Sequence, residues 1–274
     1  MKYVTYRLGA YFRRMAVQIS GDPSNPALVC VHGLTRNSHD FDRLAAEFSD
    51  QFYIVAPDLP GRGESDWLES PAVYQPMSYL EPLTHLLAWL DRPVFWLGTS
   101  LGGICGMLLA AAQGAPITRL ILNDIGPFIP AASLRRIASY IQPPERFEGL
   151  AALEAYLRTV QRGFAPMNDA DWHHMAETSS RALPDGGLAL HYDPAIATAF
   201  AATEPQDIDF WPVYRAIGCP KLIIRGEHSD LLTPETFAEV QSQGARGIVV
   251  PGAGHAPSLN DAASLAAIRE FLVA

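Results

Sequence analysis

Cysteine is scarce in this chain, and what there is has no recognisable spacing. The 274 residues include three cysteines, Cys30, Cys105 and Cys219, and no two of them form a CxxC pair. An odd count without such spacing predicts neither a disulfide framework nor a zinc site. Each cysteine lies in an apolar run, where a free thiol behaves as a small buried hydrophobe. We therefore expect a reducing compartment, the cytoplasm.

The chain also has few charged residues and no long apolar stretches. Charged residues make up 18% of the chain, and 20 basic against 29 acidic residues leave a net charge of −9. The basic residues form nothing denser than pairs such as Arg13–Arg14, so no surface replaces the counterions of nucleic acid. No apolar stretch reaches the roughly 18 residues of a membrane span, and residues 1–7 lack the apolar core of a secretory signal. We expect neither nucleic-acid nor membrane partners.

What the chain does have is an alternation of apolar runs and helix-period segments. With 49% hydrophobic residues it is a folded protein of one large domain or two. Continuous apolar strands separated by helices predict a parallel sheet covered on both faces. The predicted strands are 28–31, 52–56, 93–97, 117–122, 221–225 and 247–250, after an antiparallel hairpin of 2–8 and 13–19. The predicted helices are 38–48, 77–90, 102–112, 234–243 and 261–273.

Residues 126–209 break this alternation. Three helical segments are predicted there, over 133–140, 150–161 and 169–182, and no strand. We interpret 126–209 as a helical insertion between two strands of the sheet. The sheet domain then consists of residues 1–125 and 210–274.

One motif points to nucleophilic catalysis. Gly98-Thr99-Ser100-Leu101-Gly102 fits the pattern G-x-S-x-G and lies between a predicted strand and a predicted helix. In that setting a strained turn lifts a serine hydroxyl above the sheet, and the helix N-terminus offers N–H groups to a developing oxyanion. Small residues on either side of the turn relieve crowding there.

Several further pieces give the chain a resemblance to the α/β-hydrolase fold enzymes over nearly its whole length. In that family's order they are His32-Gly33-Leu34, Asp58 to Ser65, the turn at Ser100, Gly226 to Asp230, and Gly254-His255. The resemblance implies a mostly parallel, eight-stranded twisted sheet with helices on both faces. It also implies that 126–209 is a helical cap, inserted after the sixth strand, over Ser100.

The resemblance also implies catalytic roles. Ser100 would be the nucleophile and His255 its general base. Asp230 is the expected acid, and Asp124, directly after the strand at 117–122, is the alternative, because some family members place the acid there. The main-chain N–H groups of Leu34 and Leu101 would form the oxyanion hole.

The expected substrate site is apolar. Its predicted walls include Ile125, Phe128, Trp172, Tyr192 and Leu231, which suit an uncharged ester better than a peptide or a polyanion. No G-x-G-x-x-G or P-loop follows a strand, so no nucleotide cofactor is expected. No metal is expected either. His173 and His174 of the insertion point to different helix faces, and His191 is the insertion's third histidine.

These observations predict a serine hydrolase that cleaves small to medium, largely apolar carboxylic esters. Two alternatives remain open at this point. One is hydrolysis of a carbon–carbon bond or an enol lactone in aromatic catabolism, and the other is a slow-turnover ligand sensor of the same fold. The expected partner is a small-molecule ester, and the chain is expected to be a monomer or a homodimer.

Overall fold

The structure is a computed structural model that describes residues 1–202 and 204–274. It contains the predicted eight-stranded sheet, whose strands lie in the order β1-β2-β4-β3-β5-β6-β11-β12. Neighbouring strands from β4 to β12 pair in parallel, while β2 pairs antiparallel with both β1 and β4. The strands are β1 Lys2–Leu8, β2 Tyr11–Ser20, β3 Ala27–Val31, β4 Tyr53–Pro57, β5 Val94–Thr99, β6 Ile117–Asn123, β11 Lys221–Gly226 and β12 Arg246–Val250.

The sheet has a separate apolar core on each face. All five residues of β3 are buried. Because successive side chains of a strand point to opposite faces, Val29 and Val31 join one cluster, whereas Leu28 and Cys30 join the other. The continuous apolar run that predicted a central strand thus supplies both cores at once.

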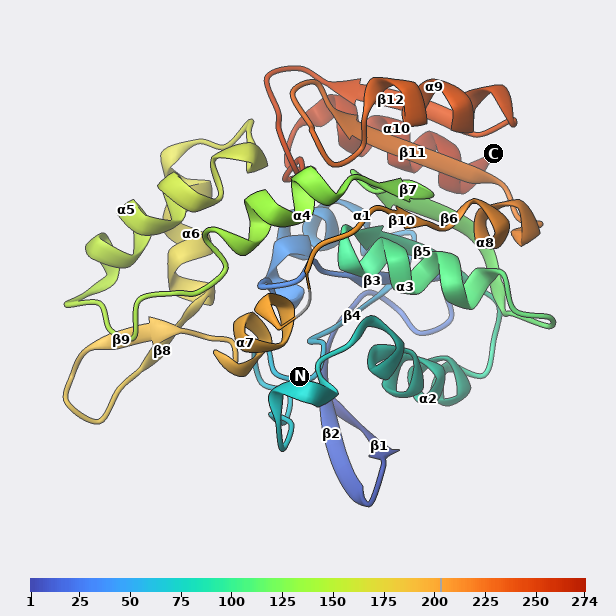
Figure 1. Cartoon of the computed structure of the whole chain (residues 1–274). Helices are drawn as coiled ribbons and strands as arrows, with labels where there is room; N and C mark the ends of the chain where they lie inside the picture. The colour runs from blue at the N-terminus through green and yellow to red at the C-terminus, as the bar shows by residue number, and fades with distance from the viewer. Residues whose placement is uncertain (203) are drawn as a thin grey trace.

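Helices cover both faces of the sheet (Figure 1). Apolar residues of α2, α3, α8 and α9 pack in one cluster, and those of α1 and α10 pack in the other. These helices are α1 Asp42–Phe48, α2 Leu80–Leu90, α3 Leu101–Ala110, α8 Trp211–Ala216, α9 Pro234–Ser242 and α10 Ala262–Val273, with 3-10 turns η1 Ser38–Phe41, η2 Pro71–Val73 and η3 Pro76–Tyr79.

Helix α3 lies especially close to the sheet because its contact face carries glycine. A Cβ at Gly106 would come within 2.3 Å of the Trp96 indole nitrogen. The same indole N–H donates a 3.1 Å hydrogen bond to the Gly102 carbonyl. Strand β5 and helix α3 are thereby held as one unit, and the turn between them carries Ser100.

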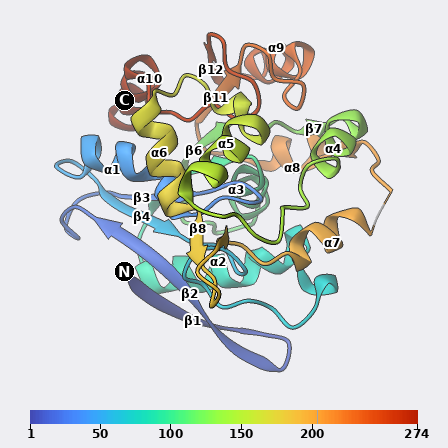
Figure 2. The same cartoon turned by 90° about the vertical axis from the view of Figure 1, so that its left-hand side faces the viewer.

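Residues 126–209, called the inserted segment below, connect β6 to β11 (Figure 1). Turning the molecule shows α5, α6 and β8 of this segment together on the side of the molecule that faces the viewer (Figure 2). The elements are β7 Phe128–Ile129, α4 Ala131–Ala138, α5 Leu150–Val160, η4 Arg162–Phe164, α6 Asp169–Thr178, β8 Ser180–Ala182, β9 Leu188–Leu190, α7 Ala195–Ala201 and β10 Ile208–Asp209.

The expectation that the inserted segment has no strand is wrong. It contains two small antiparallel ladders, β7 with β10 and β8 with β9. The predicted helix over 169–182 accordingly ends at Thr178, and the chain continues into β8. Strands of two or three residues are too short to show a periodicity that differs from that of a helix.

Candidate active site

Ser100 occupies a strained turn between β5 and α3. Its backbone has φ 50° and ψ −113°, a combination that a non-glycine residue adopts only when the surroundings impose it. The Ser100 N–H donates to the Asn123 carbonyl at 3.0 Å. A Cβ at Gly98 would meet the Gly102 carbonyl oxygen at 2.3 Å, and one at Gly102 would meet the Val31 carbonyl oxygen at 2.0 Å. The sharp turn therefore requires both glycines of the motif.

A hydrogen-bonded row of three side chains starts at this turn. The Ser100 Oγ lies 3.0 Å from His255 Nε2, and His255 Nδ1 lies 2.7 Å from a carboxylate oxygen of Asp124. Because a carboxylate accepts, Nδ1 carries the proton and Nε2 is left as the acceptor for the serine hydroxyl. The histidine is thus already in the tautomer that a general base needs.

Asp124 is fully buried at the end of β6, where its backbone adopts φ 54°. Besides His255, its carboxylate accepts from the Ser229 hydroxyl at 2.6 Å and from the Gly226 N–H at 2.8 Å. A buried charge is tolerated when hydrogen bonds of this kind replace its water. These donors also fix the plane of the carboxylate against the imidazole.

The expectation that Asp230 is the residue facing His255 is therefore wrong, and the alternative, Asp124, occupies that position. The Asp230 carboxylate is instead held by Arg136 of α4, with contacts of 2.6 Å and 2.7 Å to the guanidinium. Partial burial acts to raise the pKa of Asp230, but the hydrogen bonds and charge of Arg136 hold it below its ordinary value. Arg136, which takes the place that His255 was expected to have beside Asp230, lies in the inserted segment.

The loop after β3 places Leu34 beside Ser100. His32 lies under this loop, donating from Nδ1 to the Gly33 carbonyl at 2.7 Å and accepting at Nε2 from the Leu59 N–H at 2.8 Å. The Gly33 carbonyl and the Leu34 N–H belong to one planar peptide group, so the histidine orients that N–H. Complete burial lowers the pKa of His32 to about 3, which keeps the ring neutral.

Leu101, the other expected oxyanion donor, is the first residue of α3. Its N–H is one of the four at a helix start that have no partner within the helix. Leu34 and Leu101 both line the cavity at Ser100. Both residues therefore lie at the cavity that contains Ser100, and their role as oxyanion donors stays a prediction.

The cavity above Ser100 has a volume of about 270 Å³ and walls that are mostly apolar. Of the five predicted wall residues, Ile125 and Leu231 line it. Its remaining apolar wall comes chiefly from α4, α7 and the turns before α2, and includes Tyr74, Tyr79, Ile104, Ile129, Leu134, Ile137, Tyr140, Ile141, Phe164, Ile196, Phe200 and Ile208. The residues at 74–79 carry no motif, and only the folded structure reveals their role.

The other three predicted wall residues serve elsewhere. Phe128 belongs to the short strand β7, where it pairs with Asp209. The Trp172 ring is covered by a guanidinium, and the Tyr192 hydroxyl donates to the Ile141 carbonyl at 2.9 Å. These side chains pack the inserted segment rather than face Ser100.

Arg36 is the one permanently charged side chain among the described residues that line this cavity. It is 4% exposed, and Asp40 accepts from its Nε at 2.9 Å. The same guanidinium donates to the Ser179 hydroxyl at 2.8 Å. Its charge is therefore compensated before any ligand enters.

The inserted segment also touches the backbone of the histidine loop. The Gly254 N–H donates to the Gly163 carbonyl at 3.0 Å. A Cβ at Gly163 would lie 2.3 Å from the His255 carbonyl oxygen. The turn η4 thus packs directly on the loop that carries His255.

A strained serine turn, a buried acid–histidine pair and a parallel sheet with this strand order define the α/β-hydrolase class of enzymes. The family model for the alpha/beta hydrolase family matches residues 28–268, and the chain belongs to that family. Within the described residues, no helix is both long and apolar enough to cross a membrane.

Two curated hydrolases and one solved hydrolase structure match this chain over more than nine tenths of its length. A 3-hydroxybutyrate-oligomer hydrolase from Cupriavidus necator is 37% identical, over 96% of this chain and 94% of that protein. A 2-(acetamidomethylene)succinate hydrolase from Mesorhizobium japonicum is 29% identical, over 94% of this chain and 92% of that protein. The crystal structure of an alpha/beta hydrolase from Novosphingobium aromaticivorans superposes with a TM-score of 0.88 at 36% identity, covering 99% and 98% of the two chains. This chain is accordingly a hydrolase.

Proposed function

We propose that this protein is a serine carboxylic-ester hydrolase that acts through Ser100, His255 and Asp124. The observation that carries the proposal is the 3.0 Å contact from the Ser100 hydroxyl to an imidazole whose other nitrogen is held by a buried carboxylate. A free serine hydroxyl is a weak nucleophile, and an adjacent oriented base activates it.

In the first half of the reaction, the Ser100 Oγ attacks the ester carbonyl carbon and its proton passes to His255 Nε2. The N–H groups of Leu34 and Leu101 stabilise the oxyanion, each such donor contributing about 2.7–4 kcal/mol. The carbonyl carbon–oxygen single bond then breaks, and the alcohol leaves with the proton from His255. Water, deprotonated by His255, releases the acid and restores Ser100.

The cavity favours a small and largely apolar acyl group. Its volume of about 270 Å³ lies just below the range of about 300–1,000 Å³ that is usual for ligand sites. Because the cation Arg36 is already paired with Asp40, a dicarboxylate would find no free partner there. We propose that residues 126–209 act as a cap that closes this cavity.

An oligoester of a short hydroxy acid fits these requirements. Its ester bonds are separated by short apolar units, and the relative from Cupriavidus necator is named for such a substrate. We therefore propose short-chain esters, including oligomers of 3-hydroxybutyrate, as the substrate class. The cavity wall, rather than the relative's name, limits the acyl length.

The test compares the wild-type protein with Ser100→Ala on p-nitrophenyl acetate, butyrate and octanoate, on a 3-hydroxybutyrate dimer and on a vinylogous diketone. We expect wild-type turnover that is fastest on the short esters and falls by about four to six orders of magnitude in Ser100→Ala. Cleavage of the diketone without ester turnover would replace this proposal with carbon–carbon bond hydrolysis. Binding without turnover of any of these compounds would favour a ligand sensor.

A further inference from the structure

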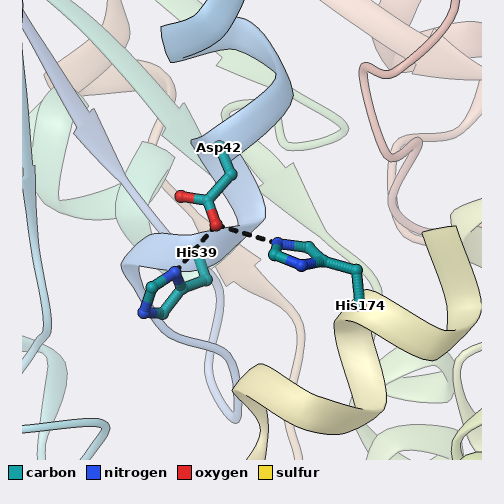
Figure 3. A group of neighbouring side chains, drawn as sticks. All are labelled: His39, Asp42 and His174. Atoms are coloured by element: carbon teal, nitrogen blue, oxygen red, sulfur yellow. Dashed lines mark hydrogen bonds and ion pairs between the residues drawn. The ribbon is translucent and has the colours of Figure 1, made fainter. Parts of the chain in front are cut away.

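Two histidines and an aspartate meet at one point outside the Ser100 cavity (Figure 3). His39 Nδ1 and His174 Nε2 each lie 2.8 Å from the same carboxylate oxygen of Asp42. All three ligand-type atoms lie within 4.8 Å of one another. The two histidines reach that oxygen from different elements, and their rings are nearly perpendicular, at 81°.

The three side chains come from two parts of the molecule. His39 belongs to η1 and Asp42 begins α1, so they share one turn of the sheet domain, whereas His174 lies on α6 of the inserted segment. Gln18 donates to the second carboxylate oxygen of Asp42 at 2.7 Å. That bond fixes the carboxylate and leaves its first oxygen directed at the two imidazoles.

We propose that His39, Asp42 and His174 bind a divalent transition-metal ion of the zinc type, which ties α6 to α1. Two imidazole nitrogens and one carboxylate oxygen form a common zinc ligand set, with water as the fourth ligand. Magnesium and calcium prefer all-oxygen sites and fit this set poorly. The sequence analysis missed the site because it considered only the histidines of the inserted segment together.

A bound ion requires the three donor atoms to rearrange, both at the two contacts to the carboxylate and between the two imidazole nitrogens, which lie within 4.8 Å of each other. Tetrahedral bonds of about 2.0–2.2 Å place neighbouring donor atoms about 3.3 Å apart. The two contacts of 2.8 Å therefore widen by about half an ångström when the ion replaces the shared protons. His174 is exposed. Its imidazole ring is therefore the one that can move to make room for the ion.

The charges around the site allow a cation. Of the arginines that line the same cavity, Arg36 is paired with Asp40 at 2.9 Å and Arg43 with Glu47 at 3.3 Å. Neither guanidinium is left to repel the ion. The cavity of about 260 Å³ beside the site shares Arg36, Thr99 and Phe164 with the Ser100 cavity, so the ion lies close to the substrate site without belonging to it.

The test uses isothermal titration of metal-free protein with Zn²⁺, and Co²⁺ absorption to report the geometry. We expect one saturable site per chain, with the intense d–d bands of tetrahedral Co²⁺. His174→Ala should weaken binding by at least about tenfold. His173→Ala is the matched control, because the His173 imidazole lies next to His174 in the chain but faces Glu154, at 3.2 Å. The His173→Ala protein should bind Zn²⁺ as the wild type does.

Stability gives a second readout that does not depend on activity. An ion that binds only the folded chain raises the melting temperature, so at a given Zn²⁺ concentration the wild-type, Ser100→Ala and His173→Ala proteins should be stabilised equally and His174→Ala by less. Equal binding by wild type and His174→Ala would overturn the proposal, as would the absence of a saturable site in the wild type. Loss of binding in His173→Ala would likewise overturn it, because it would place the ion elsewhere on α6.

Discussion

The carboxylate beside His255 is held more firmly than that of Asp230. Asp124 receives hydrogen bonds from His255, Ser229 and Gly226 at 2.6–2.8 Å and is fully buried. Asp230 has one partner, Arg136, and about half of its side chain, 47%, is exposed. The two aspartates therefore differ in both orientation and environment, although both follow sheet strands.

Replacing each aspartate by asparagine separates their roles. Asp124→Asn removes the acceptor that sets the His255 tautomer, and we expect kcat to fall by about four orders of magnitude. Asp230→Asn breaks an exposed ion pair worth about 0–1 kcal/mol, so kcat should change less than about fivefold. Steady-state kinetics on a short p-nitrophenyl ester measures both, and circular dichroism confirms folding. A larger loss in Asp230→Asn than in Asp124→Asn would refute the assignment.

Sequence reasoning placed Ser100 and His255 together, as the structure does, but expected Asp230 rather than Asp124 beside the histidine. The turn at Ser100 depends on residues adjacent in the chain, so its motif is visible without a structure. Which aspartate contacts His255 depends on which loop reaches the histidine. The loop after β6 does so with Asp124, whereas Arg136 holds Asp230 elsewhere. Arg136 lies 94 residues before Asp230, and no local pattern connects them.

At the scale of elements, the turn η4 packs against the loop that carries Gly254 and His255. Gly163 and Gly254 share a backbone hydrogen bond of 3.0 Å, and Gly163 has no room for a side chain against His255. The inserted segment therefore contacts the loop that carries His255 and also lines the cavity at Ser100.

Gly163→Ala tests this contact. Its Cβ would have to push the His255 backbone aside from a separation of 2.3 Å, and a displacement of about 1 Å can cost about a hundredfold in rate. We expect kcat to fall by about tenfold to a hundredfold, and the melting temperature to fall as well, because overpacking of this kind costs about 1–3 kcal/mol. Gly149→Ala is the control, because a Cβ added at Gly149 would have no neighbouring atom within 4 Å. Unchanged kcat in Gly163→Ala would show that the loop absorbs the contact.

Apolar periodicity predicted every strand of the large sheet, because each runs for five residues or more and is packed on at least one side. It failed for the two- and three-residue strands of the inserted segment, such as β7 and β8. It also missed α7 and the cavity wall at 74–79. The structure of these segments depends on contacts with residues distant in the sequence, and their own sequences show no apolar periodicity.

At the scale of the whole molecule, the inserted segment is attached to the sheet domain by polar contacts around the cavity. Tyr74 donates to Asp193 at 2.7 Å, Arg36 donates to Ser179 at 2.8 Å, and Arg136 holds Asp230 on the opposite side. Each joins residues far apart in the sequence, so none could be predicted from it. Together they attach the parts of the inserted segment that hold α4, α6 and α7 to the sheet domain.

The stability of the whole chain should depend on pH through His32. Its burial lowers the pKa in the folded state to about 3, whereas an exposed histidine in the unfolded chain titrates near 6.5. Below about pH 6.5 the unfolded chain binds a proton that the folded chain does not, so acid favours unfolding. The free energy of unfolding should therefore fall by about 2 kcal/mol from this residue alone between pH 7 and pH 5.

Urea denaturation of the wild type and His32→Asn at both pH values measures that contribution. The variant should be less stable at pH 7, because Asn is too short to serve both the Gly33 carbonyl and the Leu59 N–H. Its stability should nevertheless fall less steeply with acid, narrowing the gap to the wild type by about 2 kcal/mol. All other titrating groups are common to both proteins and cancel in this difference. Equal slopes for the two proteins would mean that His32 takes up its proton without unfolding, and the Gly33 carbonyl in the loop after β3 would then face a charged ring before the fold is lost.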